Sequence, residues 1–138
     1  MPTYSNAAKD ATEAQEALRG LAHATRVLDD PRLIYSILGS LSQSMGSLEQ
    51  SLRQLADYHV RTASKQALVE GDAAAGRREA EQISARLQGA ADIVRLLAAS
   101  LARAHQAEAS IADGQPRRAP HVDPPRQAPP SASAGLSL

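Results

Sequence analysis

Apolar residues recur every three or four positions along most of the first 112 residues, the spacing that places them on one side of an α-helix. This pattern predicts three helices, over about residues 5–29, 31–68 and 77–112. The spacing is most regular in the second of these segments. Its apolar positions are Ile34, Leu38, Leu41, Met45, Leu48, Leu52 and Leu55, and His59 and Thr62 continue the frame.

The other two segments carry the same alternation of four and three. In the third segment the positions are Ile83, Leu87, Ala90, Val94, Leu97, Leu101 and Ala104. In the first they are Ala7, Ala11, Ala14, Leu18, Leu21, Thr25 and Leu28. Three such rows predict coiled-coil-like heptad packing between the helices. Each row is the predicted seam along which its helix packs against its neighbours.

Two short breaks set the expected topology. "DDP" at residues 29–31 suits a helix boundary, because Asp30 can cap the next helix and Pro31 fits its first position. "VEGDAAAG" at residues 69–76 is the second break. Short connections make neighbouring helices antiparallel. The predicted fold class is therefore all-α: an antiparallel three-helix bundle in which the second and third helices form a long hairpin.

The C-terminal segment differs sharply in composition from the rest. It is rich in Pro, Ala and Ser, so it cannot bury a core, and we expect it to be disordered. The predicted domain organisation is a helical bundle over residues 1–112 followed by a tail over residues 113–138.

Many serines and glycines interrupt the second helix, although both residues disfavour helix interiors. They flank the apolar row, and Glu49 is the only charged residue from Tyr35 to Leu52. Three alternatives remain: a solvated surface, a contact with a second copy, or a contact with another protein. The candidate interaction surface comprises Gly39, Ser40, Gln43, Gly46, Ser47 and Gln50, together with Leu96, which lies off the predicted seam of the third helix.

The first predicted helix is too short to cover the whole hairpin, so the end around residues 56–87 should project as a two-helix tip. Basic residues gather there, but Glu70, Asp72, Glu79 and Glu81 are interleaved with them. A nucleic-acid footprint needs a patch of one sign. The candidate tip residues are His59, Arg61, Lys65, Arg77 and Arg78.

Composition removes several function classes. The chain has no Cys, and its 15 basic and 15 acidic residues balance. No catalytic, phosphate-binding or metal-ligand motif is present, so we expect no enzymatic activity, cofactor, metal or small-molecule substrate. No apolar signal or membrane-spanning stretch is visible, which favours a cytoplasmic protein.

These observations favour a non-enzymatic helical protein that acts as an interaction, scaffold or accessory protein. It would self-associate or dock onto the helices of a partner. The alternative is an accessory protein that binds nucleic acid weakly through the hairpin tip and the arginines of the tail.

Overall fold

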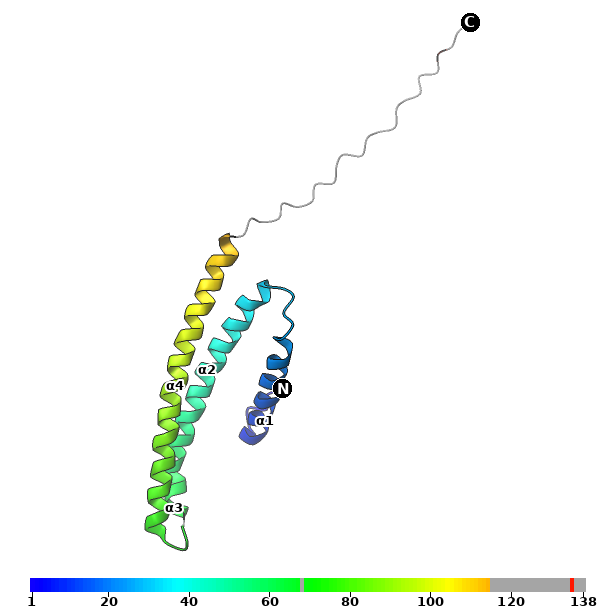
Figure 1. The fold of residues 1–138 in the computed structure, drawn as a ribbon. Helices are drawn as coiled ribbons and strands as arrows, with labels where there is room; N and C mark the ends of the chain where they lie inside the picture. Colours follow the sequence, from blue (N-terminus) through cyan, green and yellow to red (C-terminus); the bar gives the residue numbers. More distant parts are fainter. Residues whose placement is uncertain (68, 115–134, 136–138) are drawn as a thin grey trace.

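The structure, a computed structural model, describes residues 1–67, 69–114 and 135, and those residues are mostly helical with no strand among them (Figure 1). This confirms the predicted all-α class with three long helices. The predicted tail lies outside the described residues, apart from residues 113, 114 and 135. The elements are α1 (Ala7–Ala24), α2 (Arg32–Tyr58), the π-helix η1 (His59–Ala63), α3 (Ser64–Gln66) and α4 (Ala73–Gly114).

Side-chain oxygens accept backbone amides at the starts of the first two helices. The side-chain oxygen of Asn6 accepts the Lys9 N–H at 3.1 Å. At α2, Pro31 occupies the cap position, and Asp30, one residue earlier, accepts the Arg32 N–H at 3.0 Å through its side chain. Such bonds satisfy amides that have no partner within the helix. α1 ends at Ala24, earlier than the predicted residue 29, and the remaining residues to 31 form the link to α2.

The hairpin between α3 and α4 closes in a tight turn. Val69 and Asp72 exchange two backbone hydrogen bonds, of 3.2 and 2.8 Å. The two residues between them have left-handed backbones, with φ of 51° at Glu70 and 80° at Gly71. Glycine adopts that conformation at little cost. Asp72 then caps α4, because its Oδ1 accepts the Ala74 N–H at 2.8 Å and the Ala75 N–H at 3.3 Å.

We expect Asp72→Ala to lower the free energy of unfolding by about 0.5–2 kcal/mol, since α4 would lose its capping acceptor. Asp72→Asn keeps a side-chain oxygen and should lose far less. Urea unfolding followed by circular dichroism measures both variants. Equal losses in the two would show that the cap is not what stabilises this turn.

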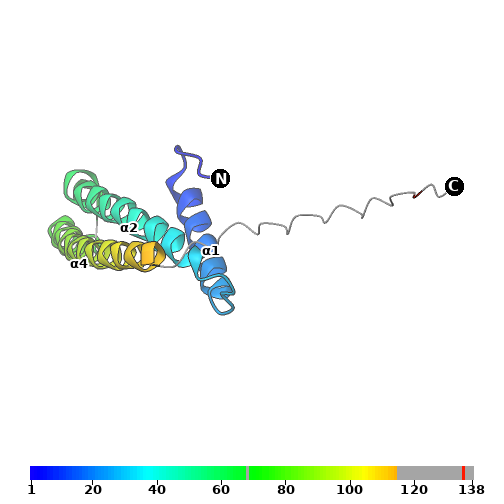
Figure 2. The same cartoon turned by 90° about the horizontal axis from the view of Figure 1, so that it is seen from above.

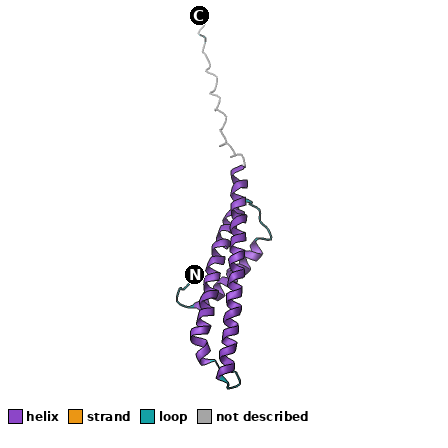
Figure 3. Cartoon of the chain, turned by 90° about the vertical axis from the view of Figure 1, so that its left-hand side faces the viewer, coloured by secondary structure: helices purple, strands orange, loops and turns teal. Residues whose placement is uncertain are grey.

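α2 and α4 pack against each other as an antiparallel pair (Figures 1 and 3). The residues that this contact buries are small: Ala56 and Ala91 are inaccessible, and Ala80 and Ser84 are nearly so. Small side chains let two helix backbones approach closely. No large side chain among the described residues is fully buried. The hairpin is therefore held by a narrow contact that leaves most of its large apolar side chains partly in solvent.

The contact face differs from the predicted seam. Leu48, Leu55 and Leu97 belong to the predicted seam, yet they are 41%, 51% and 46% exposed. The buried alanines Ala56 and Ala91 directly follow Leu55 and Ala90, whereas Leu52, Leu87 and Val94 of the predicted seam stay half-buried. Each helix is therefore rotated from the prediction by less than one residue position. The physical reason is size: small residues at the contact, such as Ala56 of α2 and Ser84 and Ala91 of α4, allow a closer approach than leucines would, and the spacing of large residues does not reveal them.

α1 stands apart from the hairpin. It runs back alongside α2 in Figure 1, but the view from above shows it crossing at an angle (Figure 2). None of its residues is buried, and no Cα atom of α1 lies within 8 Å of another described helix. The predicted packing of three helices is therefore not observed. α1 has little apolar area to bury, because three of its seven predicted seam positions are alanine and a fourth is threonine.

Candidate functional site

One long edge of the hairpin is apolar on both helices. Leu55 and Ala90 each precede a buried alanine, and one residue corresponds to a rotation of about 100° around a helix. Because the helices are antiparallel, this rotation brings both residues to the same edge of the pair. Residues seven apart repeat the position. The apolar edge, as we define it, comprises Ile34, Leu41, Leu48 and Leu55 of α2 and Ile83, Ala90 and Leu97 of α4.

The apolar edge is open to solvent along much of its length. Leu48, Leu55 and Leu97 expose close to half of their surface, and the other members of the edge expose less. Ile93 lies one helical turn before Leu97 and widens the edge, with 68% of its surface exposed. No member of the edge is charged. Large exposed apolar patches are typical of interaction sites, so this edge is the candidate site.

The opposite edge is polar. Arg53 joins the two helices there, because its guanidinium contacts Glu49 of its own helix at 2.9 Å and Asp92 of α4 at 3.0 Å. Hydrogen bonding to Asp92, and then to Glu49, raises the pKa of Arg53. Gln88, which lies four residues before Asp92 in α4, is also exposed. The hairpin thus separates its charged and its apolar side chains onto different edges.

Several serines of α2 donate their hydroxyl groups to carbonyls of their own helix. Ser44 donates to the Ser40 carbonyl at 2.7 Å, and Ser51 donates to the Ser47 carbonyl at 3.0 Å. Ser42 instead reaches across to the Ala98 carbonyl of α4 at 3.4 Å. Backbone-directed serine bonds of this kind are common in helices, so the serine content requires no partner.

The candidate surface predicted from the sequence is divided by the structure. Its role in binding stays a prediction. Gly39 faces α4, Leu96 is 64% exposed on α4, and the remaining members are exposed on α2: Ser40, Gln43, Gly46, Ser47 and Gln50. Sequence reasoning placed Leu48, Leu55 and Leu97 in the interior and so missed them as surface residues.

Gly39 marks the closest approach of α2 to His105. A β-carbon built at Gly39 would lie 2.9 Å from Cε1 of His105. The imidazole is held in place, because it stacks on Tyr35 with ring centroids 4.0 Å apart and its Nδ1 bonds the Tyr35 carbonyl at 2.9 Å. Gly39 therefore serves the contact within the hairpin.

The candidate tip residues are spread over three elements. His59 and Arg61 lie in the π-helix, Lys65 in α3, and Arg77 and Arg78 near the start of α4. Arg61 lies 3.9 Å from Asp57, in an exposed pair. The Nδ1 atom of His59 is buried without a hydrogen-bond partner among the described residues. No observation at the tip favours the nucleic-acid alternative.

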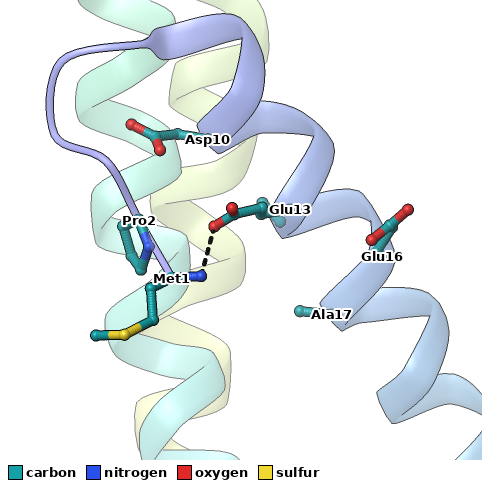
Figure 4. A pocket seen from close by; sticks show the side chains of 7 residues that line it. Met1, Pro2, Asp10, Glu13, Glu16 and Ala17 are labelled. Atoms are coloured by element: carbon teal, nitrogen blue, oxygen red, sulfur yellow. Dashed lines mark ion pairs between the residues drawn. The ribbon is translucent and has the colours of Figure 1, made fainter.

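The first residues fold back over α1 and enclose a shallow hollow lined by Met1, Pro2 and side chains of the helix (Figure 4). Two of its three carboxylates have partners: Glu13 pairs with the Met1 ammonium at 3.1 Å, and Asp10 accepts the Thr3 N–H at 2.6 Å. That amide lowers the pKa of Asp10. Within the described residues, no three His, Cys, Asp or Glu side chains form a metal-binding group.

No protein-family model matches the chain, and neither a curated protein nor a solved structure is significantly similar to it. Among the described helices, none combines the length and the apolar character needed to cross a membrane. The apolar edge is the surface from which a function can be argued.

Proposed function

We propose that this protein is a non-enzymatic interaction module that binds the helices of a protein partner along the apolar edge of its α2–α4 hairpin. One observation carries the proposal. Among its described residues, the hairpin fully buries only small ones, while large apolar residues line one edge and remain accessible to solvent.

The energetics favour covering this edge. Fully burying a leucine or isoleucine side chain contributes about 1.5–3 kcal/mol relative to leaving it exposed. Covering the exposed halves of Leu48, Leu55 and Leu97 would therefore contribute about 1 kcal/mol each. Ile93, which is more exposed, would add at least as much.

The spacing of the edge fits a helical partner. Its members repeat every seven residues on both helices, and the row on each helix can act as knobs for a facing helix. A partner helix lying between the two rows would restore the kind of heptad packing and multi-helix bundle expected from the sequence. In this proposal the bundle is completed by association, and α1 does not supply the missing helix.

A photo-crosslinking amino acid placed at single positions tests this proposal in the native host. At Leu55 or Leu97 of the apolar edge, we expect a crosslinked protein product, either with the same chain or with another protein. At Gln88, on the polar side of α4, we expect none. Gln43 reports separately on the serine-rich face that the sequence singled out.

Each outcome has a distinct meaning. Products at Leu55 and Leu97 but not at Gln88 support the apolar edge as the binding surface. Products at Gln43 alone would move the surface to the serine-rich face. The absence of any protein product at the edge would overturn the proposed function, and duplex binding with a steep salt dependence would favour the nucleic-acid alternative.

A further inference from the structure

We infer that the partner covering the apolar edge is the apolar edge of a second copy, so that two hairpins form a four-helix assembly with α2 of each copy against α4 of the other. The inference rests on the proposed function and names its partner.

The apolar edge carries no charge, which favours a second copy of the same edge as its partner. A partner chosen by electrostatics would meet charges at the site, but no member of the apolar edge carries one. The charges of the α2–α4 contact, Arg53, Glu49 and Asp92, pair with one another on the opposite edge. The chain as a whole has 15 basic and 15 acidic residues, so two copies carry no net repulsion.

Side-chain size is the second argument. Every edge residue of α2 is leucine or isoleucine. The row of α4 alternates large and small, and at the same seven-residue spacing it extends over Ile83, Ala90, Leu97, Ala104 and Ile111. Large residues pack best against gaps left by small ones. The α2 row therefore fits the α4 row of another copy better than a second α2 row.

This pairing fixes the symmetry. In one hairpin, Ser42 lies level with Ala98, and Tyr35 lies level with His105. Placing α2 of one copy against α4 of the other at the same level requires a twofold axis along the hairpin. All neighbouring helices are then antiparallel, and both hairpin tips lie at the same end of the assembly.

The accessible area is the third argument. The half-exposed members of the edge, with Ile93 and Ile111, offer about 500 Å² per copy, below the roughly 800 Å² per partner of a standard interface. An area of this size suits a reversible dimer. No Cα atom of α1 lies within 8 Å of α2 or α4, so α1 is not packed on the edge, and in the dimer α1 must lie clear of the second copy.

Sedimentation of the purified full-length chain tests the inference. We expect a monomer–dimer equilibrium with a dissociation constant in the micromolar range. Leu48→Asp/Leu97→Asp places charges in the interface and should raise that constant at least 100-fold. Gln50→Asp/Gln88→Asp adds the same charge at exposed positions off the edge and should change it less than threefold. Circular dichroism checks that helicity is retained, and Leu97→Asp alone serves if the double variant unfolds.

A distance measurement tests the arrangement. The chain has no cysteine, so Gln66→Cys provides a single labelling site at the exposed tip. Spin labels in the dimer should lie within about 30 Å of each other, because the tips share one end. Tips at opposite ends would be separated by about 60 Å, the length of α4 at 1.5 Å per residue.

Three results would overturn the inference: a wild-type monomer at high micromolar concentration, a dimer insensitive to the edge substitutions, or labels at the longer distance. The proposed function is tested independently. If the chain is monomeric but Leu55 and Leu97 crosslink to a different protein, the second copy is the wrong partner and the interaction module stands. If neither position crosslinks to anything, both proposals fail.

Discussion

Replacing Ala91 by leucine should destabilise the hairpin by about 1–3 kcal/mol or more. Ala91 is completely inaccessible in the contact between α2 and α4. The added atoms have no space to occupy, so the helices must separate or the leucine must adopt a strained rotamer. Leucine and alanine differ little in helix propensity, so the loss would measure packing. Thermal or urea unfolding at several protein concentrations gives the value.

Ala99→Leu is the matched control. Ala99 is in the same helix, but it is exposed. The same change in side chain should alter the free energy of unfolding by less than about 0.5 kcal/mol there, as is usual for surface substitutions. If Ala91→Leu proved as silent as Ala99→Leu, the leucine rows predicted from the sequence would be the true contact face.

Two glycines of α2 should respond differently to the same substitution. Gly46→Ala should stabilise the helix by up to about 1 kcal/mol, because a β-carbon there meets no atom within 4 Å. Gly39→Ala should lose that gain, because its β-carbon would displace the ring of His105 from Tyr35. A hydrogen bond and an aromatic stack contribute about 0.5–1.5 kcal/mol each. We therefore expect the two variants to differ by about 1–3 kcal/mol in unfolding free energy.

A double-mutant cycle identifies the cause. With His105 already replaced by alanine, the ring is absent, and Gly39→Ala should become stabilising, as Gly46→Ala is. If Gly39→Ala remained harmful in that background, the penalty would arise from the α2 backbone and not from the imidazole. Urea unfolding of the four proteins in the cycle decides between these explanations.

The sequence predicts the helices better than their rotation. Apolar spacing identifies the three long segments, and the glycine and aspartate of residues 71 and 72 mark the tight turn. The spacing of large residues assigns Leu55 to the interior, however, and leaves the adjacent Ala56 out of the apolar row. Which of two adjacent residues faces the neighbouring helix depends on how closely the helices approach, and alanine and glycine on both helices permit the closer approach.

The sequence does not predict the apolar edge for the same reason. Once Leu48, Leu55 and Leu97 are assigned to a core, they are no longer available as a surface, so attention moves to the serines. A helical wheel that places Ala56, Ala80 and Ala91 at the contact between the helices would predict the apolar edge. The contact of His105 with Tyr35 links residues 70 positions apart, and no local pattern reports it.

The length of the link from residue 25 to residue 31 sets a lower bound on the dissociation constant of α1 for the hairpin. A tether of this length keeps α1 within about 25 Å of the start of α2, and short flexible tethers give local concentrations in the millimolar range. A helix that stays undocked at that concentration has an intrinsic dissociation constant above about a millimolar. Any free helix that binds in the micromolar range would therefore occupy the hairpin without having to compete with the chain's own first helix.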